Sequence, residues 1–447
     1  MRVVRPRPRL GHTDEGALSV ERSRLKTFRY LSPNRLFPLF SCLYLFRTDI
    51  RAGVSISVCF VVEGKAYVGG AVRYVSLLVE GGVIKSLRGR GEGCRVLQFS
   101  GRHLILPGFV DIHVHFRDWG LSHKETLAGG SAAALAGGVV AVLDMPNTRP
   151  HIRTAGLYAR RLAEGSSLPI LYGVHMGVPE DLGELEAARP GSVKIYPEDV
   201  AQFGWPHVER LLDRCRELGC TAVFHCEDPQ YISGRRPPEA EARCADRAAV
   251  YARRGYRIHI THVSLPYTVE ALRGLATLDA TPHHLLLSSD RCSGPLCRVN
   301  PPLRSEDQRR RLLALFLAGA VDMYATDHAP HALDEKLSGS PPPGICSLDV
   351  ASSLLLRFWR DGLLGLDDVL RLYSFRPARF AGLDVSLRPG APAAFSVFRL
   401  EEFAVSERDF RGTCRFSPLV GQRAFGRAVA VASRGVLRLL ETGEAVA

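Results

Sequence analysis

Residues 111–117 read Asp-Ile-His-Val-His-Phe-Arg and directly follow the apolar run 104–110. The apolar run predicts a buried strand, and the residues after it predict the end of that strand. Side chains two residues apart on a strand point to the same face, so His113 and His115 can bind one metal ion, with Arg117 beside them. Histidines on a strand face are also common as plain polar residues, and the rest of the chain decides between the two interpretations.

Apolar strand-like runs alternate with helix-like segments through the centre of the 447-residue chain. The strands are expected near 104–113, 139–145, 169–175, 192–196, 221–226, 257–263, 278–288 and 321–327. The helices are expected at 127–136, 206–218, 239–253, 268–276 and 306–318. Eight strands that alternate with helices over about 250 residues predict an α/β fold of the parallel (β/α)8 TIM-barrel type.

Both flanks of the predicted barrel, residues 104–388, contain short apolar runs that are typical of strands. Residues 54–103 and 389–447 are therefore expected to pair into one small β-domain. Residues 1–53 form a separate basic segment, in which positions 1–51 hold eleven Arg and Lys against four Asp and Glu. We expect a disordered extension or a wrongly assigned start, and deletion of residues 1–51 should leave folding and activity nearly intact.

The composition is that of a globular protein, with 46% hydrophobic and 23% charged residues. No apolar run approaches the roughly 18 residues of a membrane span, and no membrane partner is expected. The net charge of +12 could favour nucleic acid, but +7 of it lies in the N-terminal segment, so no nucleic-acid partner is expected. The eleven cysteines include no Cys-x-x-Cys pair, and we expect them to be reduced in a cytoplasmic protein.

Metal-competent residues recur at the ends of the predicted strands, where barrel enzymes place their active sites. They are His113 and His115 after strand one, Lys194 in strand four, His225 in strand five, His262 in strand six and Asp327 in strand eight. Each alone is more often structural, but their common placement predicts a two-metal site, with zinc favoured by the imidazole ligands. A neutral, desolvated Lys194 could react with carbon dioxide, and the resulting carbamate could bridge two metals. An unmodified lysine that forms a salt bridge or contacts the substrate is the alternative.

Six motifs together resemble the dihydroorotases of the amidohydrolase superfamily. They read His-Val-His-Phe-Arg-Asp (113–118), Lys-Glu-Thr (124–126), Asp-Met-Pro-Asn-Thr (144–148), Thr-Pro-His-His-Leu (281–285), Asn-Pro-Pro-Leu-Arg (300–304) and Asp-His-Ala-Pro-His (327–331). The similarity extends from Pro107 to Gly421. Hydantoinases and allantoinases share the metal cage, but the arginine after His-x-His and the Met-Pro-Asn-Thr run favour the dihydroorotase branch.

The resemblance implies a set of site residues. Two zinc ions per subunit would be bound by His113, His115, Lys194, His225, His262 and Asp327, with carbamylated Lys194 as the bridge. Arg117, Asn147 and His331 would hold the substrate carboxylate, and Asn300 would also contact the substrate. A guanidinium suits this role because it can form two parallel hydrogen bonds with a carboxylate.

The resemblance also implies a reaction, the reversible hydrolysis of the cyclic amide of (S)-dihydroorotate to N-carbamoyl-L-aspartate, the third step of pyrimidine synthesis. Metal ions lower the pKa of bound water from about 15.7 to roughly 7. Asp327 would take the proton of the attacking hydroxide and deliver it to the departing ring nitrogen. The expected partner is thus a small molecule, while a homo-oligomer and an aspartate transcarbamoylase partner stay open.

The sequence departs from the family pattern at a few positions. Trp119 stands where many relatives have proline, and its bulk near the expected substrate end bears on substrate fit. Asp349 stands where relatives usually carry glutamate, and Ala393 and Ala394 stand where they usually have Ala-Asp. We expect these last departures to affect packing more than catalysis.

Three alternatives make different predictions. A hydantoinase or allantoinase would have the same metal ligands but would lack Arg117 and Asn147 as binding residues for a substrate carboxylate. A catalytically dead scaffold would have lost ligands, and none is missing. A nucleic-acid-binding protein has only the basic N-terminal segment in its favour.

Overall fold

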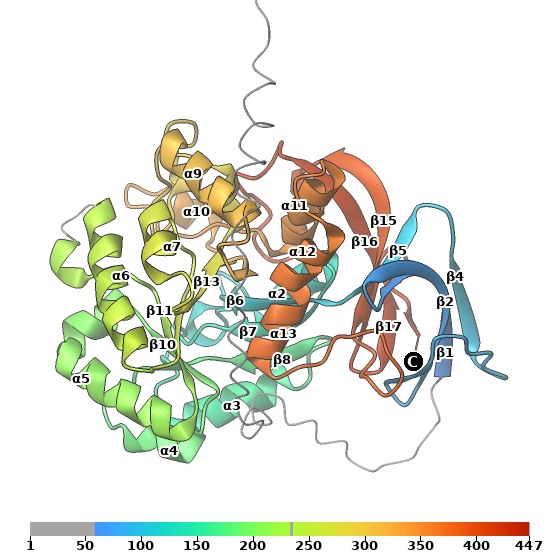
Figure 1. Ribbon diagram of the computed structural model, residues 1–447, viewed down its shortest axis with the longest axis horizontal. Coiled ribbons are helices and arrows are strands. Elements are labelled where there is room, and N and C mark those ends of the chain that lie inside the picture. The colour runs from blue at the N-terminus through green and yellow to red at the C-terminus, as the bar shows by residue number, and fades with distance from the viewer. Residues whose placement is uncertain (1–58, 233–235, 447) are drawn as a thin grey trace, which may run out of the picture. The chain divides into compact units, whose positions relative to one another are not determined.

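The computed structural model describes residues 59–232 and 236–446 (Figure 1). Eight short parallel strands form a closed barrel in it. The strands are β6 (Phe109–Val114), β7 (Val139–Asp144), β8 (Leu171–Val174) with β9 (Met176–Gly177), β10 (Ser192–Ile195), β11 (Thr221–Phe224), β12 (Ile258–Ile260), β13 (Thr277–Ala280) and β14 (Met323–Tyr324). They pair in chain order as β6-β7-β8 and β9 to β14, and β8 and β9 are consecutive pieces on either side of His175. The barrel closes where the His115 amide donates to the His328 carbonyl at 2.8 Å. The predicted (β/α)8 fold is confirmed, whereas the N-terminal extension, residues 1–53, lies outside the described residues.

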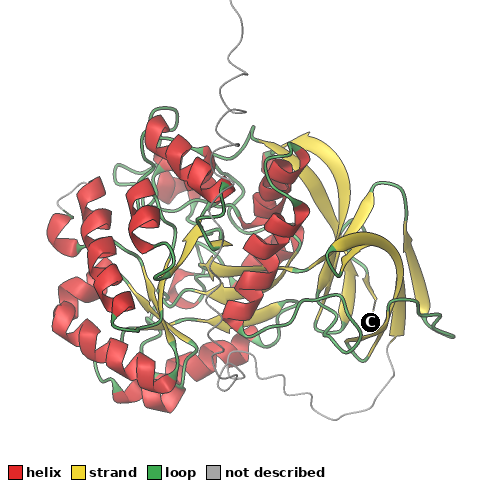
Figure 2. Cartoon of the chain, viewed as in Figure 1, coloured by secondary structure: helices red, strands yellow, loops and turns green. Residues whose placement is uncertain are grey.

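Helices follow most of these strands and surround them (Figure 2). They are α2 (Leu127–Ala136), α3 (Ala155–Gly165), α4 (Gly183–Ala188), α5 (Pro197–Leu218), α6 (Pro238–Arg253), α7 (Pro266–Leu272), α8 (Pro282–Leu286), α9 (Glu306–Leu317), α10 (Leu333–Lys336), α11 (Leu348–Arg360), α12 (Leu366–Leu370) and α13 (Arg376–Ala381). The strands are buried on both faces, which explains their continuous apolar runs. Where a helix was expected from Pro206, α5 begins nine residues earlier and bends at Gly204, whose φ is 75°.

Strands from both flanks of the barrel pair in one further sheet. It contains β1 (Cys59–Val68), β2 (Ala71–Glu80), β3 (Val83–Ser86), β4 (Arg95–Phe99), β5 (His103–Pro107), β15 (Phe395–Ala404), β16 (Arg423–Ser433), β17 (Val436–Leu439) and β18 (Ala445–Val446). The order is β18-β17-β16-β15-β5-β1-β2-β3, with β4 against β1. The antiparallel pair β5–β15 joins the segment before the barrel to the segment after it.

The strand expected over 104–113 is two strands that meet at Gly108. Residues before it belong to the flanking sheet and residues after it begin the barrel. A Cβ atom on Gly108 would lie 2.4 Å from the Val140 methyl carbons, so only glycine allows the chain to pass this close to β7. The Gly108 amide donates to the carbonyl of Ala394 at 3.0 Å. Ala393 and Ala394 are both buried at this junction, where an aspartate would be without water.

The prediction of one strand over 278–288 is wrong after Ala280, where β13 ends and α8 follows. The Thr281 side chain accepts a hydrogen bond from the His284 amide at 3.3 Å, and Pro282 occupies the first helical position. Threonine followed by proline is a helix-start signal that outweighs the apolar pattern of the next residues.

The expectation of reduced cysteines is also wrong for most of the described positions. Four disulfides join Cys59 to Cys94, Cys226 to Cys244, Cys292 to Cys297 and Cys346 to Cys414. Only Cys215 and Cys220, both buried, are free among the described cysteines. The partners are 5 to 68 residues apart, and only Cys292 and Cys297 lie close together in the sequence. Disulfides are typical of oxidising compartments, but they also occur inside the cells of hyperthermophiles.

Asp349 anchors the loop around Arg411. This buried carboxylate, in the first turn of α11, accepts a hydrogen bond from the Arg411 amide at 2.6 Å. The neighbouring Glu125 accepts from the Thr413 amide at 3.0 Å. Burial raises the pKa of Asp349 from 3.8 to about 7, and the nearby Glu125 adds to this rise.

Asp349→Asn should therefore change stability in a pH-dependent way. Below pH 4 the carboxyl is protonated in both the folded and unfolded states, so burying it carries no ionisation cost. Between pH 4 and 7 the unfolded state loses its proton first, so the wild-type free energy of unfolding falls as the pH rises. The stability of the variant relative to wild type should rise by roughly 2 kcal/mol from pH 5 to pH 8, as measured by denaturant unfolding. A difference that is the same at both pH values would contradict this account.

Within residues 59–232 and 236–446, none of the helices has the length and apolar character needed to cross a membrane.

Candidate active site

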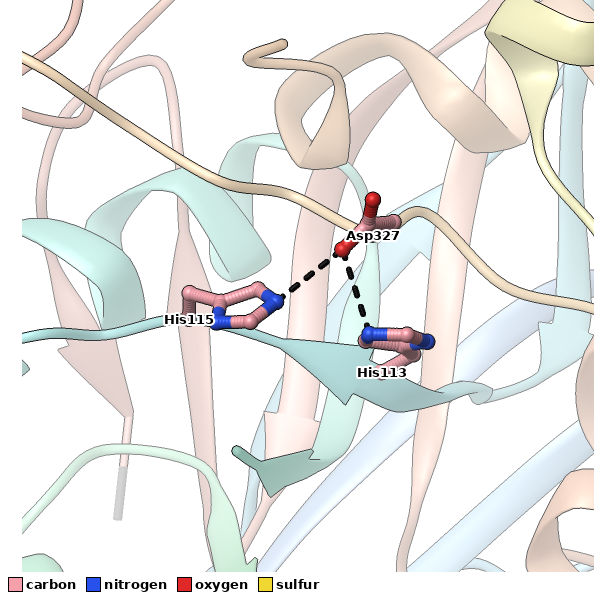
Figure 3. A group of neighbouring side chains, drawn as sticks. All are labelled: His113, His115 and Asp327. Carbon is pink, nitrogen blue, oxygen red and sulfur yellow. Dashed lines mark hydrogen bonds and ion pairs between the residues drawn. The ribbon is translucent and has the colours of Figure 1, made fainter. Parts of the chain in front are cut away.

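Two histidines and an aspartate meet at the ends of the first and last barrel strands (Figure 3). His113 lies in β6 and His115 directly after it, while Asp327 follows β14. The Oδ1 atom of Asp327 is 3.1 Å from Nε2 of His113 and 3.0 Å from Nε2 of His115. All three residues are buried, and their ligand atoms lie within 4.8 Å of one another.

The ends of β10, β11 and β12 bring two further histidines and Lys194 to the same place. His262 follows β12, and its ring centre is 5.1 Å from that of His113 and 4.5 Å from that of His225. Lys194 in β10 is fully buried, and its Nζ donates to the Thr261 hydroxyl at 2.7 Å. The structure thus brings the four predicted histidines and Asp327 together, while Lys194 lies among them without lining the cavity.

The electrostatic state of these groups suits a cation. Burial lowers the pKa of His113 to about 4, and Lys194 contributes to this shift. Burial also lowers the pKa of Lys194, to about 7. For Asp327, burial alone would raise the pKa, but His113 and His115 outweigh it and hold the value well below the usual range. Near neutral pH His113 is therefore uncharged and Asp327 is ionised.

Several nitrogen and oxygen atoms of the site lack a matching hydrogen-bond partner. His115 faces two acceptors, with Nδ1 2.8 Å from Asn147 Oδ1 and Nε2 3.0 Å from Asp327 Oδ1. A neutral imidazole carries one N–H and can serve only one of them. Among the described residues, Nδ1 of His113 and Nδ1 of His262 are buried without any hydrogen-bond partner. A divalent cation between Nε2 of His113, Nε2 of His115 and Oδ1 of Asp327 would replace these unmatched contacts, so the residues fit a zinc-type site.

Backbone strain is concentrated at the same positions. Arg117, His262 and Asp327 have φ values of 49°, 42° and 46°, in the left-handed region that residues other than glycine rarely adopt. Such conformations persist only where the surrounding structure enforces them, and they cluster at functional sites.

A cavity of about 240 Å³ opens above this cluster. Its lining is His113, His115, Arg117, Asn147, His151, Arg153, Tyr196, Glu198, Asp199, His225, Arg236, His262, Val299, Asn300, Asp327, Ala329, Pro343 and Gly344. Three predicted substrate-binding residues, Arg117, Asn147 and Asn300, therefore border the same space as the histidines. The cavity volume suits a small ligand.

His331 lies behind this lining instead of in it. Its Nε2 is 3.4 Å from a guanidinium nitrogen of Arg117 and 3.0 Å from the carbonyl oxygen of Pro343. Its Nδ1 is 3.1 Å from Nζ of Lys124. In this structure His331 is placed to orient Arg117.

Trp119, expected near the substrate, packs away from the cavity. Its indole nitrogen donates to Glu164 on α3 at 2.7 Å. The guanidinium carbons of Arg160 and Arg161 lie 4.9 and 5.3 Å from the centre of its ring. Trp119 therefore does not narrow the space available to a substrate.

Sequence reasoning missed two groups beside the histidines, Glu227 and Arg236. The carboxylate of Glu227 is 2.7 Å from Nε2 of His225 and is also paired with the guanidinium of Arg236. Glu227 could have been found, because it is two residues from His225 at a strand end and so points to a similar side. Arg236 lies in a loop, and nothing in its sequence neighbourhood marks it.

Comparisons with known proteins agree with the geometry. The Amidohydrolase family matches residues 104–416. The dihydroorotase of Pyrobaculum aerophilum is 58% identical over 380 residues, which cover 84% of this chain and 95% of that protein. The dihydroorotase of Aeropyrum pernix is 36% identical, with 75% of this chain and 84% of that protein covered. The dihydroorotase of Thermococcus kodakarensis is 33% identical, with 84% and 93% covered.

Solved structures share the fold at lower identity. The L-hydantoinase (dihydropyrimidinase) from Arthrobacter aurescens superposes with a TM-score of 0.79 at 21% identity, over 87% of this chain and 98% of that one. The D-hydantoinase (dihydropyrimidinase) from a Thermus species gives 0.77 at 21% identity, over 85% and 95%. At this identity the likeness concerns the fold alone.

Proposed function

The chain belongs to the amidohydrolase family and, within it, to the dihydroorotases, and from this premise we propose that it interconverts (S)-dihydroorotate and N-carbamoyl-L-aspartate. The observation that carries the proposal is the 58% identity to a dihydroorotase over 95% of that protein's length. The Arg117 and Asn147 side chains support it, because they place donors for a carboxylate in the cavity beside the histidines. Hydantoin and allantoin carry no carboxylate for these donors to hold.

Two zinc ions are the cofactors we propose, held by His113, His115, Lys194, His225, His262 and Asp327. When bound, they supply a hydroxide at neutral pH and polarise the amide carbonyl. Lys194 would bridge them as a carbamate. Its buried amine has a pKa of about 7 and is therefore largely uncharged above neutral pH, the form that attacks carbon dioxide. A nitrogen–carbon bond forms, one proton leaves, and the side chain becomes an anion.

The chain's own residues would orient the substrate and move one proton. Arg117 would form two hydrogen bonds with the substrate carboxylate, and Asn147 and Asn300 would add amide donors. His331 would act through Arg117, which it contacts from behind. Asp327 would accept the proton of the attacking hydroxide at a carboxylate oxygen and return it to the ring nitrogen as the carbon–nitrogen bond breaks.

The remaining parts of the proposal rest on the family. They are a place as the third step of pyrimidine synthesis, a cytoplasmic location and a small-molecule partner without nucleic acid or membrane. A homo-oligomer and an aspartate transcarbamoylase partner are both compatible with it.

The direct experiment follows the reaction in both directions. Purified, zinc-reconstituted protein should form carbamoyl-aspartate from dihydroorotate and dihydroorotate from carbamoyl-aspartate, and both reactions should approach the same equilibrium ratio. Zinc removal with a chelator should stop both directions, and zinc addition should restore them. A fully reconstituted protein that converts neither compound would refute the proposal.

Arg117→Met should impair substrate recognition while the metals stay bound. A hydrogen bond to a charged group contributes roughly 1.5–3 kcal/mol, so kcat/KM for dihydroorotate should fall at least about tenfold. Metal analysis of the same preparation should give the wild-type zinc content. Unchanged kcat/KM would remove Arg117 from the substrate site.

A further inference from the structure

Arg236 connects two parts of the candidate active site that come from different strand ends. Its side chain is 16% exposed and lines the cavity. Its carbonyl oxygen accepts a hydrogen bond from Arg304 at 3.0 Å, which fixes its backbone. Its guanidinium reaches Glu227, Glu198 and Asn300, so one cation contacts two loops and the first turn of α5.

On one side, Arg236 acts on His225 through Glu227. Nη1 of Arg236 donates to Oε2 of Glu227, and the same oxygen lies 2.7 Å from Nε2 of His225. Nε2 of His225 also lies 3.3 Å from Nη1 of Arg236, but the carboxylate is closer and can only accept, so we assign the proton to Nε2. The lone pair of the imidazole is then on Nδ1. A carboxylate that accepts from the outer nitrogen of a metal-binding histidine fixes the tautomer and the orientation of the ring.

On the other side, Arg236 sets the direction of the Asn300 amide. With the amide oxygen toward Arg236, it accepts from Nε at 3.1 Å and the amide nitrogen donates to the Val299 carbonyl at 3.1 Å. The reverse orientation would set two donors against each other and two acceptors against each other. The amide nitrogen has two hydrogens, and Val299 takes one of them. Asn300 can therefore present a donor, and not its oxygen, to an anion in the cavity.

We propose that Arg236 is a positioning residue that orients two side chains of the site. It leaves Nδ1 of His225 free to bind a metal, and it turns an N–H of Asn300 toward the substrate. The part that concerns Asn300 and the substrate, the substrate half, rests on the proposed dihydroorotase function. The part that concerns His225 and the metal, the metal half, depends only on the contacts of Glu227 and His225.

The test removes the guanidinium and measures both halves separately. In Arg236→Ala, zinc retention against a competing chelator should fall severalfold, and in Glu227→Gln, which changes the direct partner of His225, it should fall about 10–100-fold. KM for dihydroorotate should also rise in Arg236→Ala. Adding methylguanidinium to Arg236→Ala should partly restore both values, whereas methylammonium at the same concentration should not.

Two further variants act as controls. Arg153 also lines the cavity but pairs with Asp199 and Gln202. Arg153→Ala removes the same charge, so its kcat/KM reports the loss of charge alone, and its zinc retention should match wild type. Asn300→Ala should raise KM without loss of zinc. In the double variant Arg236→Ala/Asn300→Ala, the two KM effects should be less than additive, because the residues act through one contact.

Wild-type zinc retention in Arg236→Ala would overturn the metal half, and additive KM effects would overturn the substrate half. Rescue by methylammonium as efficient as that by methylguanidinium would reduce the role of Arg236 to its charge and would overturn both. Should the wild-type protein not convert dihydroorotate, the proposed function fails, while the zinc measurement still decides the metal half.

Discussion

Asp327→Asn is expected to lower kcat for dihydroorotate by at least about 10²-fold and by as much as about 10⁴-fold. The amide keeps the shape of the side chain but cannot take a proton from the attacking hydroxide. It also removes the anion that lies 3.0–3.1 Å from both His113 and His115, so one metal should bind more weakly. Single-turnover kinetics at saturating zinc would separate the lost proton transfer from the weaker metal binding.

A matched control lies at the opposite end of the same strand. Asp322 precedes β14 at the face that barrel enzymes use for stability, where its carboxylate bonds the Leu278 amide and Arg376. Asp322→Asn should therefore keep kcat close to wild type. Activity of Asp327→Asn within a few-fold of wild type would assign the base to another residue.

Lys194→Ala should lose at least one metal and most of the activity. A bridging ligand between two cations must be an anion, and an unmodified lysine supplies no negative charge, whether its amine is protonated or neutral. Zinc content per chain should fall together with kcat. A short carboxylic acid such as acetate or propionate should partly restore both, because its carboxylate can occupy the space of the lost carbamate. Lys85→Ala, which changes an exposed lysine in β3, should leave both quantities unchanged.

A high-resolution electron-density map of the zinc-loaded protein would test the same residue directly. We expect density for a carbamate on Nζ of Lys194. A bare amine with both metals present would refute the carbamate. One occupied metal with Lys194 turned away would instead indicate a mononuclear site.

The barrel could be predicted because its strands are buried on both faces and therefore read as continuous apolar runs. The boundaries were harder, for local reasons. The run across Gly108 is apolar throughout, although the chain leaves one sheet there and enters another. At Thr281 a capping side chain and a proline begin a helix within an apolar segment that resembles a strand.

The positions of the candidate ligands could be predicted because strand ends converge in a parallel barrel, so His113, His262 and Asp327 had to approach one another. Their assignment as ligands is still a prediction. Arg236 could not be found in this way, because it reaches the site from a loop and its role depends on contacts with Glu227 and Asn300. The disulfides were missed for a similar reason, since only the folded chain brings Cys346 to Cys414.

The central claim is that this site hydrolyses a cyclic amide that carries a carboxylate. Its most direct test is the kcat/KM of zinc-reconstituted protein for dihydroorotate, hydantoin and allantoin, measured in one preparation of known zinc content. We predict that kcat/KM is higher for dihydroorotate than for hydantoin or allantoin. Arg117→Met should make the three kcat/KM values more similar. A wild-type preference for hydantoin or allantoin would contradict the assignment.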